Sequence, residues 1–241
     1  PYEASKMPLK FFLKFFQNHG LFKFKNRPQW YTVAKRSRTY VTKVLSSISG
    51  EYYKNYNVNR LIRRSNGIDL YYGDKSEFFS YDKVVLASHA DQALSIIDEP
   101  TKEEQEILSK FKYRENIAVI HTDESIMPNN KDIWSSWNSS VDKNNVEKNS
   151  ITYWLNLLQN LDFNKNIFLT LNPNFKINED KILKKVNFTH PYFDQSALDN
   201  QDKLKNLQNK KNLLFCGSYF GYGFHEDGIK SSIEMIKAID V

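Results

Sequence analysis

The chain has little cysteine and no long hydrophobic run. Its 241 residues include one cysteine, Cys216, which excludes an internal disulfide and a multi-cysteine zinc site. A single thiol favours a reducing, cytoplasmic compartment. No run reaches the roughly 20 apolar residues that a membrane-spanning helix needs. With 40% apolar residues, the chain can still bury a sizeable core, in one large domain or two smaller ones.

The charges lack the clustering that a nucleic-acid binder usually shows. The chain carries 34 Lys and Arg against 28 Asp and Glu, for a formal net charge of +6. Most lysines are scattered among acidic residues and asparagines, a distribution typical of a soluble surface. We therefore expect no nucleic-acid partner.

Motifs for hydrolytic or metal chemistry are missing. His225-Glu226 has no second histidine one helical turn later, so the zinc-protease pattern fails and we expect no metal. Gly217-Ser218 lacks the residue that a nucleophile elbow places between glycine and serine. Cys216 lies in an apolar run, which favours an inert, buried thiol. Such a chain leaves its chemistry to a cofactor.

The strongest feature present is a strand, a glycine-spaced turn and a helix near the C-terminus. The apolar run 213–216 reaches Gly217, and residues 221–228 lead into a helix with Ile229, Ile233, Ile236 and Ile239 on one side. Free N–H groups and the positive end of a helix dipole favour an electron-rich ligand there. Four residues separate Gly223 from Gly228, so the spacing differs from the dinucleotide fingerprint. We predict a cofactor contact, but not the primary pyrophosphate loop.

The remaining pattern predicts α/β segments on both sides of an antiparallel sheet. The run 83–87 reads as a strand buried on both faces, in the middle of an α/β sheet. We expect helices over 8–17, 37–45, 91–97, 101–111 and 194–208, and a hairpin of 57–63 and 68–72 followed by strand 77–81. We expect antiparallel strands over 117–121, 133–137, 151–157, 167–171 and 182–188, with 142–149 as the most polar connection.

The first predicted helix has two interpretations. Leu9, Phe12, Leu13 and Phe16 share one face, which favours packing against the rest of the protein. Its lysines and further phenylalanines also fit a basic helix that rests on a lipid surface, so peripheral membrane contact stays open.

Two of the five histidines are candidates for a ligand site. His225 lies in the glycine turn, and His89 follows the 83–87 strand, where open α/β sheets bind ligands. For His19, His121 and His190 we expect structural roles.

Several segments together resemble the flavin-containing amine oxidase superfamily, specifically its bacterial FAD-dependent oxidoreductases. The similar segments cover nearly the whole chain, and the last is the most specific. They are residues 28–30 with 37–41, 84–93, 121–123, 134–138, 152–156 with 158–159, 171–173, 190–191 with 193–194, and 215–217 through 225–228.

The resemblance implies an α/β fold, α+β overall: the C-terminal part of a two-domain, FAD-binding Rossmann-like protein with an inserted antiparallel sheet. Proteins of this kind carry a dinucleotide-binding unit with G-x-G-x-x-G, which this sequence lacks. The implied domains are a helical part of the substrate domain (1–50), returning FAD-domain strands (51–97), the substrate-domain sheet (98–190), and the last FAD-domain strand and helix (191–241). We expect this portion alone to be inactive.

The resemblance also implies FAD as cofactor and suggests which residues contact it. Val58 matches a position whose backbone meets the adenine, and Ala87 and Ser88 end a strand near the dinucleotide. Gly217 and Ser218 match the ribityl and pyrophosphate region. The remaining cofactor contacts implied are His225, Glu226, Asp227 and Gly228, at a helix start that would face the flavin pyrimidine edge and stabilise the negative charge formed there when hydride reaches N5.

The sequence departs from the family pattern at two places. Relatives usually carry two glycines where this chain has Lys35 and Arg36, which puts a close backbone approach there in doubt. Ser218 replaces an acidic residue that many flavoproteins place after the glycine, so a carboxylate acceptor is lost.

The implied activity is hydride transfer from an organic substrate, an amine or a lipid-like CH–CH group, to flavin N5. One fold serves several chemistries, so the substrate stays open. The aromatic side chains of the inserted sheet would either wall a substrate cavity or form core; they are Trp134, Trp137, Tyr153 and Trp154. The alternative is a non-catalytic lipid-surface or binding module.

Overall fold

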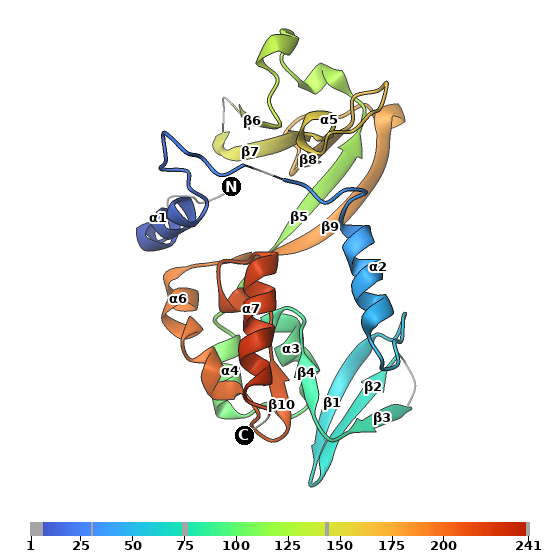
Figure 1. Cartoon of the computed structure of the whole chain (residues 1–241), viewed down its shortest axis with the longest axis vertical. Helices are drawn as coiled ribbons and strands as arrows, with labels where there is room; N and C mark the ends of the chain where they lie inside the picture. The colour runs from blue at the N-terminus through green and yellow to red at the C-terminus, as the bar shows by residue number, and fades with distance from the viewer. Residues whose placement is uncertain (1–6, 30, 74–76, 143–144, 240–241) are drawn as a thin grey trace. The chain divides into compact units, whose positions relative to one another are not determined.

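The computed structural model describes residues 7–29, 31–73, 77–142 and 145–239 (Figure 1). It is a mixed α/β protein whose chain divides into two compact units. Among the described residues, the sheet unit is formed by Met7 and residues 114–190, and the turn unit by residues 8–113 and 191–239. Trp30, part of one segment of the resemblance, lies outside the described residues.

The helices of the turn unit lie close to their predicted positions. Gly20, with φ of +64°, follows the end of the first helix, as its position in the sequence predicts. Thr101 caps the fourth helix as predicted: its hydroxyl accepts the N–H of Glu104, whose carboxylate accepts the N–H of Thr101. The α-helices are α1 (Leu9–Asn18), α2 (Ser37–Ser47), α3 (Ala90–Ile96), α4 (Lys102–Leu108), α6 (Gln195–Gln201) and α7 (His225–Ile236).

The helix predicted over 194–208 is shorter in the structure. It ends at Gln201, and a 3₁₀ turn, η5 (Leu204–Leu207), follows it. Leu204 and Leu207 are fully buried three residues apart, a spacing that the three-residue period of a 3₁₀ turn places on one side. The sequence pattern does not distinguish this packing from that of an α-helix, so the predicted helix was too long.

Two small sheets belong to the turn unit. The predicted hairpin is confirmed as β1 (Val58–Arg64) and β2 (Gly67–Tyr72), and β3 (Phe78–Tyr81) pairs with β2. The second sheet has two parallel strands, β4 (Val84–Leu86) and β10 (Leu213–Phe215).

The prediction that β4 is buried on both faces in mid-sheet is wrong for the described chain. β10 is its only strand neighbour there, and the Val85 side chain is 41% exposed. Val85 lies in register with Leu214, so both point to the face that α7 covers. Met235 of α7 packs on Leu214 and Cys216, whereas the Val85 side chain remains exposed to solvent.

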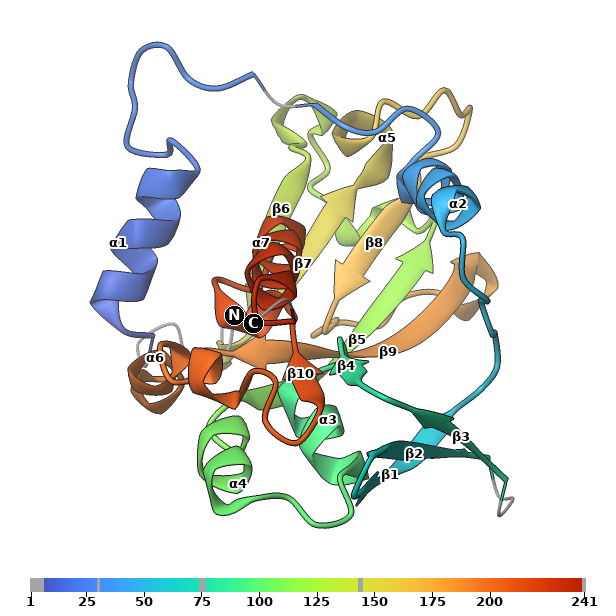
Figure 2. The same cartoon turned by 60° about the horizontal axis from the view of Figure 1, so that its bottom comes forward.

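The sheet unit contains one five-stranded sheet, whose strands β6, β7, β8 and β5 run side by side in Figure 2. Its strand order is β6-β7-β8-β5-β9, and the described pairs β6–β7, β7–β8 and β8–β5 are antiparallel. The strands are β5 (Lys112–His121), β6 (Trp137–Asp142), β7 (Asn145–Trp154), β8 (Phe168–Leu171) and β9 (Ile182–Tyr192).

Three strand predictions need correction in this unit. Residues 133–136 are not a strand, because the Asn130 side chain accepts the N–H of Asp132 (3.0 Å) and starts a 3₁₀ turn. The expected polar connection 142–149 is largely β7, with residues 143–144 outside the described range. β7 ends at Trp154, where α5 (Leu155–Leu158) begins.

Each unit has its own core. The turn unit buries a large cluster that includes Leu61, Ile68, Leu108 and Phe215, and the sheet unit buries Met127, Trp134 and Phe168. In the part of the chain that is described, no helix has the length and hydropathy to cross a membrane.

Candidate functional site

The carboxyl ends of the parallel strands β4 and β10 lie together, which is where open α/β sheets bind ligands. Ala87 and Ser88 directly follow β4, and the Ser88 carbonyl oxygen is 3.6 Å from the place a Cβ on Gly217 would occupy. A Cβ on Gly228 would be 3.9 Å from the Ser218 backbone nitrogen. The fold thus gathers Ser88, Gly217, Ser218 and Gly228, four of the residues predicted to contact the cofactor.

Two glycines of this turn occupy positions that other residues cannot fill. A Cβ on Gly217 would be 2.7 Å from the ring of Tyr219, which is fully buried. A Cβ on Gly221 would lie within 2.3 Å of the Asp227 carboxylate. Glycine is therefore required by close packing, independently of any ligand.

The Asp227 carboxylate is used inside the turn. It accepts the N–H groups of Tyr222 (2.9 Å) and Phe224 (3.0 Å) and thereby caps α7. The N–H groups of Asp227 and Gly228 both bond to the Phe224 carbonyl.

The first N–H groups of α7 remain for a ligand. Within the described residues, no hydrogen bond engages the backbone N–H of His225 or Glu226. Two unbonded N–H groups at the positive end of a 12-residue helix form a good environment for an electron-rich ring edge or an anion. The open donors thus lie at the beginning of the predicted segment 225–228.

Three side chains that the sequence analysis missed hold the turn in place. The Ser231 hydroxyl accepts the N–H of Gly217 (2.9 Å) and donates to the Gly228 carbonyl (2.8 Å). The Gln201 amide donates to the Tyr219 and Gly221 carbonyls, while Gln208 bonds both the N–H and the C=O of Phe215. The sequence offered one signal for these side chains: Ser231 is a polar residue on the buried face of α7.

The side chains of the two candidate histidines both lie against tyrosines. His225 Nδ1 is 3.5 Å from the Tyr40 hydroxyl, at the outer limit of a hydrogen bond. The His89 ring stacks on Tyr113 at 4.1 Å between centroids, and His89 precedes α3 as its N-cap. The Tyr113 hydroxyl accepts the Ala90 N–H, and burial raises the Tyr113 pKa to about 12.

Val58 lies apart from these residues in the hydrogen-bond pattern. It begins β1, opposite Tyr72 of β2. Among the described residues, no hydrogen bond joins it to the glycine turn, so its predicted adenine contact stays a prediction.

Lys35 and Arg36, at the two positions where the resemblance led us to expect glycines, have positive φ angles of 57° and 68°. Arg36 also has ψ of −176°, a combination that glycine almost alone adopts without strain. The backbone therefore keeps a glycine-like conformation at the start of α2 although the glycines are absent.

This strain leads to a mutational prediction. Replacing Arg36 by Gly should stabilise α2 by about 1 kcal/mol, because relief of left-handed strain exceeds the entropy that glycine adds to the unfolded chain. Slower hydrogen exchange of the α2 amides would show it. Lys43→Gly also removes an exposed cation, but in the middle of α2, and it should destabilise the helix by about 1 kcal/mol. Faster exchange in both variants would contradict the strain argument.

The four aromatic side chains predicted near the substrate lie on opposite faces of the five-stranded sheet. Trp134 and Trp154 contact edge to face at 5.4 Å and pack with Phe168 in the core. Their indole N–H groups donate to Pro128 O and Asn166 Oδ1. Of the two roles considered for these aromatic side chains, cavity wall or core, Trp134 and Trp154 have the core role.

Trp137 and Tyr153 lie on the other face. They are paired across β6 and β7, with ring centroids 5.7 Å apart, and Trp137 is 59% exposed. We call this face the open sheet face. Because side chains alternate along a strand, it also carries aliphatic side chains from β5, β7 and β8. They are Ile120, Ile151, Leu169 and Leu171, all partly buried. These four side chains are apolar, so together with Trp137 and Tyr153 they suit an apolar partner.

The covered face contains a buried polar chain. His121 Nδ1 accepts the Asp123 N–H (3.2 Å), and its Nε2 bonds Thr170, which bonds Thr152. Burial lowers the pKa of His121, so the ring is neutral, in agreement with a structural role. No group of His, Cys, Asp and Glu that could hold a metal ion exists among the described residues, and Cys216 is buried and free.

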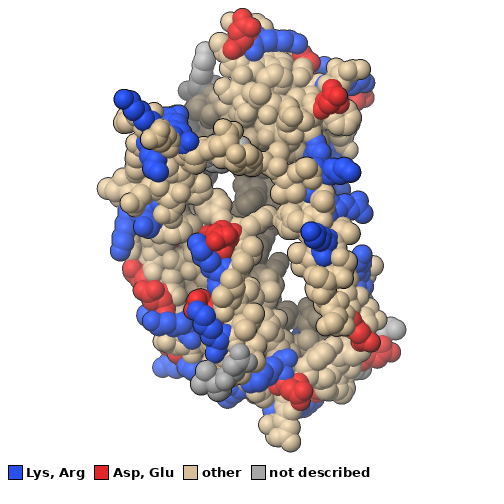
Figure 3. All heavy atoms as spheres, in the orientation of Figure 1, with Lys and Arg blue, Asp and Glu red and all other residues tan. Residues whose placement is uncertain are grey.

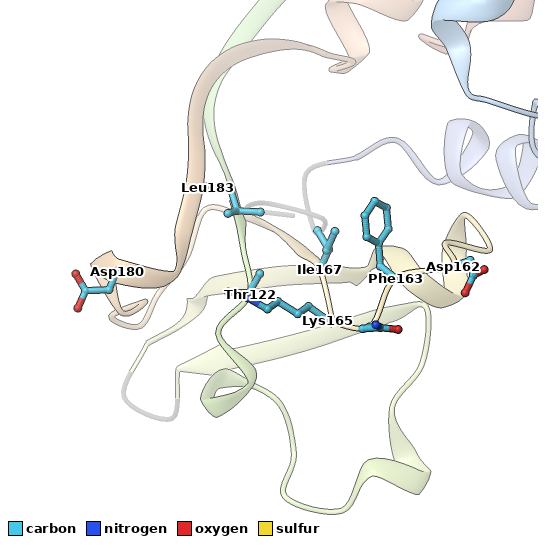
Figure 4. Close-up of a pocket in the computed structure, with 8 residues that line it drawn as sticks. Thr122, Asp162, Phe163, Lys165, Ile167, Asp180 and Leu183 are labelled. Atoms are coloured by element: carbon cyan, nitrogen blue, oxygen red, sulfur yellow. The ribbon is translucent and has the colours of Figure 1, made fainter.

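The sheet unit also has an open pocket of about 530 Å³. Figure 4 shows Asp162 and Asp180 at opposite ends of it, with Leu183 and Phe163 between them.

Comparison with known proteins shows the fold. No family model matches the sequence, and no curated protein matches it significantly. A fatty acid isomerase from P. acnes described as CLA-producing is 14% identical (TM-score 0.62, 88% of this chain and 53% of that one). A protein assigned as a protoporphyrinogen oxidase from Exiguobacterium sp. 255-15 is 10% identical (TM-score 0.63, 96% and 58%). A double mutant of putrescine oxidase, from a redesign of cofactor binding, is 8% identical (TM-score 0.59, 86% and 53%). The chain thus spans somewhat over half the length of these structures.

Proposed function

We propose that this chain supplies the flavin-facing C-terminal part and the substrate-domain sheet of an FAD-dependent oxidoreductase. One observation carries the proposal: Ser88, Gly217, Ser218 and Gly228 meet at the carboxyl ends of β4 and β10, beside the open N–H groups of α7. The shared fold with structures that include a putrescine oxidase and an isomerase supports it.

The residues at this site fit an electron-rich ring edge better than a pyrophosphate. The N–H groups of His225 and Glu226 are open, whereas those of Asp227 and Gly228 bond to Phe224. FAD would supply the acceptor for a hydride. The chain would contribute orientation and fixed positive dipole at the start of α7, held by the Asp227 cap and by Ser231.

The grip on the rest of the cofactor would come from a dinucleotide-binding unit beside β4. The Val84 N–H donates to the Asn212 carbonyl, and the Cys216 N–H donates to the Leu86 carbonyl. The backbone groups of Val84 and Leu86 therefore face β10. The backbone groups of Val85 therefore point to the other edge, where a further parallel strand could bond. Exposed Ile229, Ile233 and Ile236 form one stripe of α7, which such a unit could cover.

The substrate we propose is apolar, oxidised at a CH–CH bond. The open sheet face carries Trp137 and Tyr153 beside the aliphatic side chains of three strands. An amine donor is the second candidate, because the edge-to-face pair of Trp137 and Tyr153 offers ring surfaces to a cation.

A flavin spectrum tests the proposal. The chain should be purified alone and also joined to any coding sequence that continues its reading frame. The longer protein should show flavin absorbance that substrate bleaches without oxygen, and the 241-residue chain alone should lose FAD on gel filtration. A folded, colourless longer protein that cannot be reconstituted would sink the enzyme proposal in favour of a binding module. Stoichiometric FAD binding by the chain alone would contradict the need for a further unit.

The contribution of the backbone can be separated from that of the side chain at His225. This is the first residue of α7, where proline is tolerated, and the extended Phe224 (ψ 163°) suits a following proline. His225→Pro removes one N–H and should weaken flavin binding about tenfold. His225→Ala keeps that N–H and should stay within about threefold. Equal losses in both variants would assign the effect to the imidazole.

A further inference from the structure

The helix α1 is apolar on two sides, and only one of them is packed. Phe11 is buried, with its ring 5.0 Å from those of Phe193 and Tyr222. Phe15 lies 5.7 Å from Phe224. These contacts anchor α1 in the turn unit through one face.

The opposite side of α1 faces solvent. Leu9, Phe12 and Leu13 are exposed, and Leu9 is exposed to 68%. With Phe16 they recur at the spacing of one helical stripe. A ten-residue helix that exposes such a stripe after using another face for packing has apolar surface left for a partner.

The segment after α1 extends this surface. Gly20 turns the chain at φ +64°, and Leu21, Phe22 and Phe24 are then exposed. Phe24 is 95% exposed, which is unusual for so large an apolar side chain. We call residues 9–27 with these side chains the α1 surface.

The charges of the α1 surface have one sign. No Asp or Glu occurs in residues 7–29. In Figure 3, Lys and Arg atoms gather over the segment after α1 with no Asp or Glu atoms among them. The exposed cations are Lys10, Lys14, Lys23, Lys25 and Arg27.

We propose that the α1 surface docks on an anionic membrane, with its exposed apolar side chains inserted at the headgroup boundary. Apolar side chains rimmed by cations match the two attractions of a negatively charged lipid surface. A second copy of this surface would instead bring five cations against five. The inference goes beyond the proposed function and does not require flavin binding, so either can fail alone.

Sedimentation with vesicles tests the proposal on the full chain. Binding should be strong to vesicles of equal parts phosphatidylcholine and phosphatidylglycerol, weak to phosphatidylcholine alone, and should fall as salt is raised. The double variant Lys23→Glu and Lys25→Glu should lower the partition coefficient at least about thirtyfold, because each lysine contributes about 1 kcal/mol and every 1.4 kcal/mol is tenfold. The pair Phe22→Ser and Phe24→Ser should lower it by about tenfold or more.

Matched controls sit on the sheet unit. Lys184→Glu with Lys185→Glu changes net charge equally at exposed residues of β9, and Ile133→Ser removes a 61% exposed apolar side chain. Both should bind like the unchanged protein. Absence of vesicle binding, or equal losses in test and control variants, would overturn the proposal. So would light scattering showing that Phe22→Ser and Phe24→Ser dissociate a dimer while vesicle binding persists.

Discussion

Replacing Gly217 by Ala is expected to lower the free energy of unfolding by about 3 kcal/mol. The new methyl carbon would lie 2.7 Å from the Tyr219 ring, and Gly217 has φ of +155°, which side chains rarely adopt. Tyr219 cannot move aside easily, because it is fully buried and contacts the ring of Phe111 at 5.4 Å. Urea unfolding followed by circular dichroism measures the change.

Gly50→Ala is the matched control for this substitution. Nothing lies within 4 Å of the Cβ that it would add, so its effect should stay within about 0.5 kcal/mol. If the two alanine variants proved equally stable, the close approach of Gly217 to Tyr219 would not be a packing constraint, and glycine there would need another explanation.

Replacing Glu104 by Ala is expected to cost about 3–5 kcal/mol. Glu104 is 2% exposed and forms an ion pair with Arg63, whose side chain is 13% exposed. Its other carboxylate oxygen accepts the Thr101 N–H at the start of α4. The substitution therefore leaves the largely buried Arg63 guanidinium without its carboxylate partner, and it removes one of the two hydrogen bonds of the α4 cap. Thermal and urea unfolding should both show the loss.

Glu106 offers the control on the same helix. Its side chain is 63% exposed and lies 3.8 Å from Lys102. Because exposed pairs contribute little, Glu106→Ala should change stability by less than about 0.5 kcal/mol. A small effect of Glu104→Ala, similar to that of Glu106→Ala, would mean that Arg63 reaches water when its partner is removed.

Local signals in the sequence predicted the elements that depend on local chemistry. The Ser65-Asn66-Gly67 hairpin, the Thr101 cap and the Gly20 helix end are all present, because each is decided within a few residues. The strand predicted over 133–137 failed at Asn130, whose side chain diverts the backbone into a turn. Apolar periodicity alone does not register that competition.

Burial was harder to predict than secondary structure. The run 83–87 has the composition of a central strand, yet Val85 is exposed because α7 covers its neighbour Leu214 only. Similarly, the sequence does not separate Trp134 and Trp154 from Trp137 and Tyr153. Their distribution between two sheet faces depends on register with β8, a long-range property.

At the candidate site, residue types indicated the turn but not its internal bonds. Asp227 was expected among the cofactor contacts, and its carboxylate is engaged by Tyr222 and Phe224. The open donors belong to His225 and Glu226. Gln201, Gln208 and Ser231 act on the turn from seven to 20 residues away, beyond the reach of a motif.

The Gln208 amide leaves only one edge of the small parallel sheet open to further strands. By bonding both the N–H and the C=O of Phe215, it occupies the outer edge of β10 as a neighbouring strand would. Additional strands can then join only at β4, beside Val85. A sheet closed on one side cannot act as a two-ended template, so two such chains could pair once but could not polymerise through these edges.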